Sequence, residues 1–229
     1  MESYIATYTL LETKMNLKSN QHGGRCESST DHVLVQIWDR VLRDLDTSQG
    51  KAKASVICGI DFSKSFSRCF YQLILESYVQ LGASQWVIDM HAAFLTDRCI
   101  QVKVGDVLSP LQSVTGGAVQ GSVLGVMDHN AVMEAVDDEL MTEAHKYVDD
   151  LTTTETIPAN SNGYDQHLED GSVTEVIHAP MSEYNWRTIT NYCAHSHLKV
   201  NENKTQLLAI SSNKHPTNCL LYTSPSPRD

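Results

Sequence analysis

The chain has 229 residues, 41% hydrophobic and 20% charged, which is typical of a globular protein rather than a disordered or fibrous one. No stretch approaches the ~18 consecutive apolar residues of a membrane-spanning helix, and the first residues lack the basic and apolar regions of a secretory signal. The net charge of −11 argues against a dedicated nucleic-acid-binding protein, but it does not exclude an enzyme that holds cations at a carboxylate cluster.

The first half of the chain predicts helices around one buried strand. Residues 31–45 carry apolar side chains at helical spacing. Residues 54–62, ASVICGIDF, form a short apolar run rich in β-branched residues, as in a strand buried on both faces. This strand ends on Asp61, and a carboxylate there is costly without a cation or a hydrogen-bond donor. The other elements expected in this half are helices over 70–82 and 84–96 and a hairpin over 99–108.

The second half predicts a mixture of strands and helices. Residues 145–155 carry β-branched residues on both sides of an Asp-Asp pair, which favours a hairpin with the acids at its tip. Residues 157–182 are polar and lack periodicity, so they are interpreted as a long loop or insertion. The Pro/Ser-rich tail, 213–229, is expected to be disordered and, since its end resembles translated sequencing-adaptor sequence, not native. The remaining expected elements are a glycine-rich loop over 115–125, helices over about 126–140 and over 182–195, and a strand over 204–211.

The pair Asp149-Asp150 poses a question, because two like charges stand side by side in a strand-like segment. A solvated turn is the usual explanation for such a pair. The chain also contains Asp137-Asp138, in a helical segment with no evident chemistry. If the fold brings Asp61 beside Asp149, their oxygens become hard ligands that suit Mg²⁺. Two Mg²⁺ ions roughly 4 Å apart could then clamp the attacking and leaving oxygens of a phosphoryl transfer.

Four segments, in this order and at these spacings, resemble the reverse transcriptase domain of non-LTR retrotransposons. An upstream segment, NQHGGRCESSTDHVL (20–34), is similar to that family's fingers-to-palm region. The resemblance covers about residues 20–212, and 1–19 would be a remnant of the fingers. The four segments, corresponding to motifs A to D, are DFSKSF (61–66), GAVQGSVLG (117–125), YVDD (147–150) and LKVNENKTQLLA (198–209).

The resemblance implies an α+β fold: a right-hand polymerase palm, with an antiparallel sheet backed by helices, partial fingers and no thumb. It implies a site for two Mg²⁺ ions, with Mn²⁺ as a substitute. Asp61 and Asp149 would ligate both metals, Asp150 would support the site, and the backbone carbonyl of Phe62 would complete a metal's coordination shell.

The resemblance also implies a nucleotide site. Backbone N–H groups of Lys64 and Ser65 would face the triphosphate. Phe66 would crowd the sugar 2′ position and so favour deoxynucleotides; without the motif it is an ordinary core aromatic. Gln120 and Gly121 would lie beside the nucleotide and template, although QGS alone predicts only a turn.

One further residue is assigned to catalysis by the resemblance. Lys204 would stabilise charge on, or donate a proton to, the pyrophosphate leaving group; the alternative is a solvated lysine after a turn. Tyr147 is expected to pack under the hairpin.

The chain departs from the family's pattern in several places. Val119 replaces the proline that usually precedes the glutamine, Ser67 stands where the family often has Asp or Asn, and 126–136 is more polar than the usual apolar run. None of these changes removes an expected metal ligand. The arginine-proline-isoleucine segment usual at the front is missing from 1–19, and no endonuclease or RNase H segment is evident.

These motifs predict an RNA-directed DNA polymerase fragment of a retrotransposon, and the truncated chain is not expected to be active alone. The alternatives are a degenerate, catalytically inactive remnant, or another Mg²⁺-dependent phosphotransferase, although no GxxxxGK[ST] loop is present. The implied partners are an RNA template, a DNA primer, deoxynucleoside triphosphates and the rest of a retrotransposon polyprotein, with no membrane. The six scattered cysteines fit a reducing interior, and the family implies the cytoplasm and nucleus, not secretion.

Overall fold

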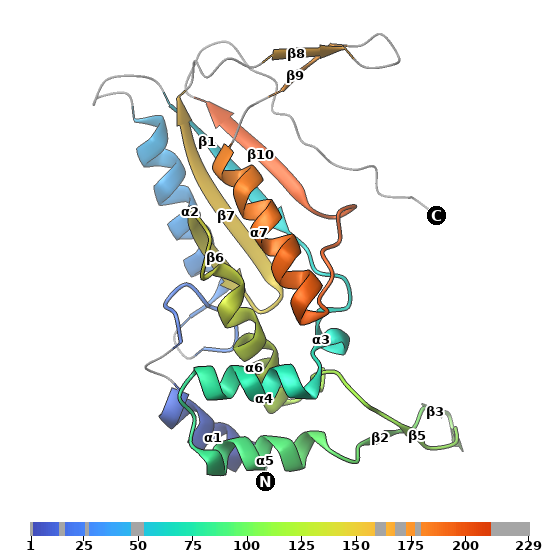
Figure 1. Cartoon of the computed structure of the whole chain (residues 1–229). Helices are drawn as coiled ribbons and strands as arrows, with labels where there is room; N and C mark the ends of the chain where they lie inside the picture. The colour runs from blue at the N-terminus through green and yellow to red at the C-terminus, as the bar shows by residue number, and fades with distance from the viewer. Residues whose placement is uncertain are drawn as a thin grey trace.

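A computed structural model shows a mixed arrangement of helices and antiparallel sheet (Figure 1). The central sheet has four strands in the order β10-β1-β7-β6, all paired antiparallel. These strands are β1 (Lys53–Ile60), β6 (Glu143–Tyr147), β7 (Asp150–Pro158) and β10 (Gln206–Ser211). The structure describes residues 2–13, 17–25, 28–46, 53–158, 164–167, 173–176 and 180–211.

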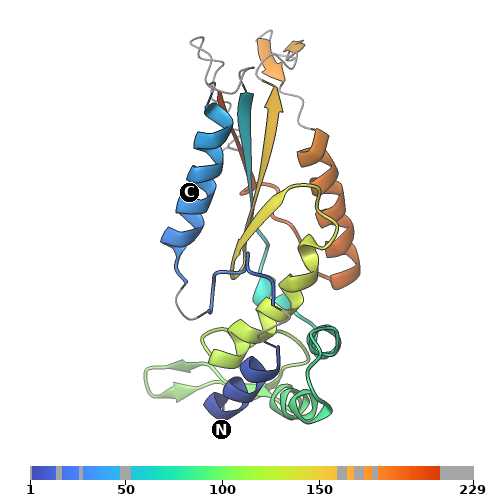
Figure 2. The same cartoon turned by 90° about the vertical axis from the view of Figure 1, so that its left-hand side faces the viewer.

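Two helices flank the sheet on opposite faces (Figure 2). One is α2 (Thr30–Leu45), and the other is α7 (Pro180–Ser196). The face of β1 toward α7 is apolar: Cys58 and Ile60 are buried in the main core together with Ile189 of α7. Because side chains alternate along a strand, the intervening residues of β1 face α2.

Helix α2 confirms the periodicity of 31–45, and a capping box between Ser29 and His32 defines its start. Its apolar stripe is nevertheless only partly covered. Val41 is fully buried, whereas Leu34 and Trp38 are more than half exposed. Periodicity thus predicted the helix correctly but overestimated its burial.

A second layer of helices packs below the sheet (Figure 1). A buried polar network joins its members. Asp128 lies 2.8 Å from the ring of His91 and accepts a hydrogen bond from the Tyr78 hydroxyl, and Thr9 contacts the other side of the His91 ring at 2.9 Å. These four side chains have exposures of 0–1%, so they fix how the helices pack. The helices are α1 (Glu2–Thr13), α4 (Tyr71–Gln80), α5 (Gln85–Leu95) and α6 (Val123–Met133), which continues into the 3-10 helix η2 (Glu134–Asp137).

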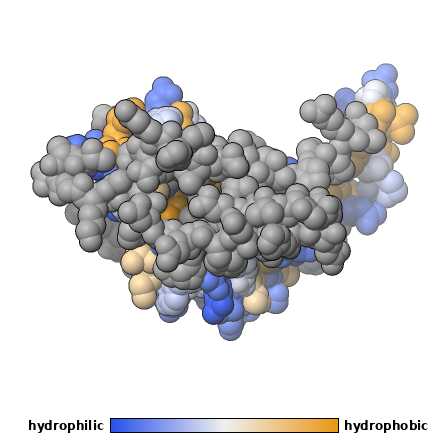
Figure 3. Space-filling view, turned by 90° about the horizontal axis from the view of Figure 1, so that it is seen from above, coloured by the Kyte–Doolittle hydropathy of each residue, from blue (hydrophilic) through white to orange (hydrophobic). Residues whose placement is uncertain are grey.

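A long hairpin projects from this layer, as the Gly-Asp turn predicted (Figure 1). Its apolar residues are largely exposed, for example Val104 and Val107 at 73% each. Seen from above, the projecting lobe carries both hydrophobic and hydrophilic residues (Figure 3). Its strands are β2 (Cys99–Ile100), β3 (Lys103–Val104), β4 (Val107–Leu108) and β5 (Gln112–Ser113).

Two sequence expectations need correction. The described parts of 157–182 are not irregular: β7 continues to Pro158, and β8 (Tyr164–His167) pairs with β9 (Val173–Val176). The sequence of this hairpin lacks the apolar alternation by which strands are recognised, so periodicity missed it. The helix expected over 126–140 starts three residues earlier, where Ser122 caps α6 by accepting a hydrogen bond from the backbone N–H of Gly125. The predicted disordered tail, 213–229, lies outside the described residues.

Candidate functional site

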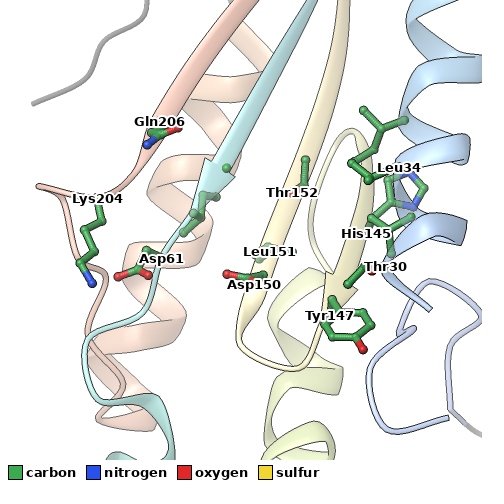
Figure 4. Close-up of a pocket in the computed structure, with 14 residues that line it drawn as sticks. Thr30, Leu34, Asp61, His145, Tyr147, Asp150, Leu151, Thr152, Lys204 and Gln206 are labelled. Atoms are coloured by element: carbon green, nitrogen blue, oxygen red, sulfur yellow. The ribbon is translucent and has the colours of Figure 1, made fainter. Parts of the chain in front are cut away.

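The end of β1 lies beside the tip of the β6–β7 hairpin. The last β1–β7 pair is Ile60 with Leu151, and Tyr147 pairs with Asp150 to close the hairpin. Asp149 therefore occupies the hairpin turn, and Asp61 follows directly after the neighbouring strand. Figure 4 shows Asp61 at the end of β1 and Asp150 at the start of the neighbouring β7, both lining the same cleft. The fold thus places Asp61 next to the hairpin tip that carries Asp149 and Asp150.

The three carboxylates have no basic partner in the described part of the chain, where every ion pair involves other residues. Asp61 and Asp149 are half-buried, and Asp150 is exposed as a whole residue. Partial burial of its carboxyl group, followed by the nearby charges of Asp149 and Asp61, raises the pKa of Asp150. Uncompensated negative charge is therefore concentrated at this point.

Asp137 and Asp138, the other Asp-Asp pair, have a different environment. Asp137 is bound by Lys146 at 2.9 Å and by Lys18 at 2.7 Å, and Lys18 also reaches Asp138. Burial alone would raise the pKa of Asp137, but Lys146, together with hydrogen bonds from Lys18 and Asn20, lowers it. Lysines thus neutralise the Asp137-Asp138 pair, whereas no lysine or arginine in the described chain forms an ion pair with Asp149 or Asp150.

The turn after Asp61 is linked to the hairpin tip by Ser65. This residue is buried, and its hydroxyl lies 3.4 Å from the Asp149 carboxylate, to which it donates. Ser65 begins the one-turn helix α3 (Ser65–Arg68), and the preceding Lys64 has a left-handed backbone with φ 53°. The first turn of a helix leaves backbone N–H groups without helical partners. Donors at Lys64 and Ser65 are therefore placed next to the acidic cluster.

The backbone at Phe62 is also suited to ligand binding. Phe62 pairs with Val200 as an isolated antiparallel bridge. The two hydrogen bonds that flank this pair use the Ser63 N–H and the Asp61 carbonyl. The Phe62 carbonyl takes part in neither of them.

Asp61 and Asp150 open onto a cleft of about 360 Å³ between α2 and the sheet (Figure 4), and Asp149 is not among its lining residues. Lys204 lines the same cleft, although it forms no ion pair with either acid within the described residues. Tyr147, expected to pack under the hairpin, is half-buried and lines the cleft instead. The lining residues are Thr30, Val33, Leu34, Ile37, Gly59, Ile60, Asp61, His145, Tyr147, Asp150, Leu151, Thr152, Lys204 and Gln206.

His145 also lines the cleft, and the sequence analysis overlooked it. It is 3% exposed, and neither ring nitrogen has a hydrogen-bond partner in the described chain. Burial lowers its pKa, against an opposing effect of Glu143. The two-residue period of a strand places His145 on the same face as Tyr147, so the hairpin prediction contained the signal that could have identified it.

The hairpin tip is supported from the N-terminal side by Gln21 and Gly23. Val148 has φ 58°, a strained value for a β-branched residue. The side-chain oxygen of the buried Gln21 accepts hydrogen bonds from the backbone N–H groups of Val148 and Gly23, at 3.3 and 3.0 Å. A Cβ at Gly23 would lie only 2.5 Å from Val148, so this close approach requires glycine. These supporting roles had no signal in the sequence beyond the resemblance of the segment.

The glycine-rich loop packs onto α3. The Gly117 N–H donates to the Cys69 carbonyl, and the Ala118 N–H donates to the Phe66 carbonyl. Gly117 has φ 94°, and an added Cβ would lie 3.2 Å from the Ser67 backbone. The loop is therefore held against the helix that carries Phe66.

Two predicted residues of this loop lie outside the cleft. Gln120 and Gly121 are exposed in the turn before α6, and no described contact joins them to the acids. Phe66 is half-buried, and its ring stacks on His129 with centroids 4.4 Å apart.

The donor set fits Mg²⁺, since carboxylate and carbonyl oxygens are the ligands this ion prefers. Within the described chain, no three His, Cys, Asp or Glu side chains are close enough to form a metal site unaided. Mg²⁺ is typically bound by one or two carboxylates, with water and substrate phosphates completing its shell. The site therefore suits a cation that is held jointly by protein and substrate.

No family model and no curated protein matches the sequence. Solved structures match the fold. Telomerase from Candida albicans, in complex with a TWJ fragment of telomeric RNA, superposes with a TM-score of 0.64 at 12% identity, over 94% of this chain and 35% of that one. Apo telomerase from Candida tropicalis, truncated from its C-terminal domain, gives 0.62 at 12% identity, over 93% and 41%. The Candida tropicalis enzyme with a TWJ fragment gives 0.61 at 13% identity, over 93% and 34%.

At such identities the likeness shows the fold alone. The neighbours are telomerase reverse transcriptases, so the predicted α+β polymerase fold is confirmed. The chain spans between 34% and 41% of the length of these telomerases. No helix in the described residues is long and apolar enough to cross a membrane.

Proposed function

We propose that this chain is the catalytic palm region of an RNA-directed DNA polymerase. The observation that supports it best is the position of Asp61 beside the Asp149–Asp150 hairpin tip, where the charges of Asp61 and Asp149 act on Asp150 and no described lysine or arginine pairs with these acids. The likeness to telomerases adds a polymerase fold to this chemistry. A structural acidic cluster would be expected to carry lysine partners, as Asp137 does.

Asp61 and Asp149 would hold two Mg²⁺ ions, with Asp150 beside them and the Phe62 carbonyl as a further ligand; Mn²⁺ would substitute. Bound Mg²⁺ would supply charge stabilisation to the attacking and leaving oxygens of phosphoryl transfer. Ser65 orients the Asp149 carboxylate through its hydroxyl. The protein's own contribution is thus to position the oxygens and to keep them free of competing lysines.

The incoming deoxynucleotide would bind at the turn after Asp61. Backbone N–H groups of Lys64 and Ser65 would contact its phosphates, and the Phe66 ring would lie against the sugar. Lys204, on the same cleft as the acids, would stabilise the pyrophosphate leaving group. Gln120 and Gly121 would border the template, which requires the template to reach beyond the cleft.

The proposed partners are an RNA template and a DNA primer. Two of the similar telomerase structures contain an RNA fragment. The order of the four motifs supports an origin in a non-LTR retrotransposon, with the remaining contacts to nucleic acid supplied by other parts of a longer polyprotein. A net charge of −11 is consistent with basic contacts being supplied by those other parts, because neutralisation of phosphates dominates affinity for nucleic acid.

Mn²⁺ binding is measured by electron paramagnetic resonance on the 229-residue chain, and DNA primer extension is measured on an RNA template with the chain carried in the longer polyprotein that would supply the remaining nucleic-acid contacts. Asp61→Asn and Asp149→Asn are expected to weaken Mn²⁺ binding by on the order of tenfold or more, and to slow extension by on the order of a hundredfold or more. Asp138→Asn is the matched control, because this carboxylate is 58% exposed and pairs with Lys18.

Two results would overturn the proposal. A 229-residue wild-type chain that binds no Mn²⁺, together with a polyprotein that extends no primer, would refute the polymerase function. Near-wild-type extension by Asp61→Asn or Asp149→Asn would show that the metal assignment is wrong.

A further inference from the structure

A buried histidine on α6 supports the aromatic ring of the proposed nucleotide site. The His129 ring stacks on the Phe66 ring with centroids 4.4 Å apart and planes 15° apart. His129 is 0% exposed, whereas Phe66 is half-buried. One face of Phe66 is thus covered by a fixed ring, and part of its surface remains accessible.

His129 does not have the contacts of a structural histidine. Neither of its ring nitrogens has a hydrogen-bond partner in the described chain, and burying such groups without partners destabilises a protein. His91, also fully buried, contacts Thr9 and Asp128 instead. An apolar side chain would fill the position of His129 without that loss, so the flat ring itself needs an explanation.

The protonation state of His129 favours stacking. Burial lowers its pKa to about 4, against a smaller opposing effect of Asp149. The ring is therefore neutral at physiological pH. Two aromatic rings in a nearly parallel arrangement gain about 0.5–1.5 kcal/mol beyond their burial.

Phe66 needs such support because its own element is short. Helix α3 has four residues, and its backbone is tied to the glycine-rich loop by the hydrogen bond from Ala118 to the Phe66 carbonyl. Those bonds fix the backbone, and the Phe66 side chain is positioned by its packing against the main core and by the stack on His129. His129 belongs to the 11-residue helix α6, which is packed against α1 and α4. The more rigid helix thus determines where the Phe66 ring lies.

We propose that His129 is a positioning residue that holds the Phe66 ring at the sugar 2′ position, and that it thereby sets the preference for deoxynucleotides over ribonucleotides. This inference rests on the proposed polymerase function and adds a specificity determinant to it. Loss of the flat surface under Phe66 leaves space into which the ring can move. A ribonucleotide 2′-hydroxyl then meets less obstruction.

The experiment compares kcat/KM for deoxynucleotides and ribonucleotides in the longer polyprotein used for primer extension, with equilibrium binding of both nucleotide classes to the 229-residue chain in Mn²⁺ as a second readout. His129→Leu, which fills the space without a flat face, is expected to lower the deoxynucleotide preference by about tenfold or more, chiefly through KM for the ribonucleotide. His129→Ala serves as a second variant, and Phe66→Val should lower the preference similarly. His129→Phe, which keeps a ring, should retain the preference to within about threefold.

His91→Leu is the matched control. It removes another fully buried histidine, in contact with Tyr78 at 4.2 Å between centroids, away from the site. It is expected to lower stability without changing sugar preference. Circular dichroism identifies the variants that fold, and only those are compared.

The possible outcomes separate the two proposals. A wild-type polyprotein that extends no primer, together with a 229-residue chain that binds neither nucleotide, refutes the polymerase function, and this inference with it. A wild-type chain that prefers deoxynucleotides, together with unchanged preference in His129→Leu and His129→Ala, overturns the positioning role and leaves the polymerase function standing. An equal loss in His91→Leu would also overturn it, since the effect would then be one of general stability.

Discussion

Replacement of Asp137 by alanine is expected to destabilise the protein strongly. The Lys146 side chain is 0% exposed and that of Asp137 is 4% exposed, with 2.9 Å between Nζ and Oδ1. Without the carboxylate, Lys146 keeps only the Met133 carbonyl at 3.2 Å and Glu134 at 3.7 Å. Removing one partner of a buried pair typically costs about 3–5 kcal/mol, and the remaining Glu134 contact favours the lower end, about 3 kcal/mol. In a domain of this size, the midpoint of thermal unfolding would fall by about 6–12 °C.

Urea and thermal unfolding of Asp137→Ala and Asp138→Asn provide the assay. Asp138 is 58% exposed, so its loss should cost less than about 1 kcal/mol. The pKa of Asp137 is lowered in the folded state, so its contribution is present above its ordinary value of 3.8 and is lost as pH falls through the folded-state value. The wild type should therefore lose more stability on acidification than Asp137→Ala. Equal effects of the two substitutions would show that Asp137 is not the buried anchor assigned to it.

Two further predictions concern the hairpin tip. Asp150→Asn should stabilise the protein at neutral pH, because the pKa of Asp150 is raised in the folded state and wild-type stability therefore falls as pH rises from below 3.8 through the folded-state value. Unfolding measured as a function of pH should show no such fall in the variant, and a destabilised variant would contradict the assigned repulsion. Gln21→Leu leaves the Val148 N–H without its side-chain acceptor, so it should lower the free energy of unfolding in urea by about 1–3 kcal/mol and weaken Mn²⁺ binding. Unaltered Mn²⁺ affinity would show that Gln21 does not support the site.

The sequence predicted the elements whose burial is asymmetric. The strand over 54–62 was identified correctly from its apolar, β-branched run, and the hairpin over 145–155 from the β-branched residues on both sides of the Asp-Asp pair. The polar hairpin of β8 and β9 has no such pattern. Helix α2 was identified correctly in extent but not in burial, because periodicity reports which face is apolar and not whether another element covers it.

The acidic site was only partly predictable. Asp61 and Asp149 could be joined from motif order, since the motif implies which strands are neighbours. The roles of Gln21 and His129 could not be predicted, because they depend on contacts with residues more than sixty positions away. Gln21 contacts Val148, and His129 contacts Phe66. A buried glutamine or histidine has no periodic signature, and only the packed structure shows which group each one supports.

The contrast between the two Asp-Asp pairs explains why composition could not locate the site. Both pairs have the same letters, and both lie near lysines in the fold. Lys18 and Lys146 reach Asp137 at ion-pair distance, whereas Lys204 shares a cleft with Asp150 and forms no ion pair with it in the described structure. A bound lysine at Asp150 would stabilise the fold and would also occupy the oxygens that a metal ion needs. Groups with perturbed, uncompensated charge cluster at functional sites, so the unpaired acids, rather than the number of acids, are what supports the proposed site.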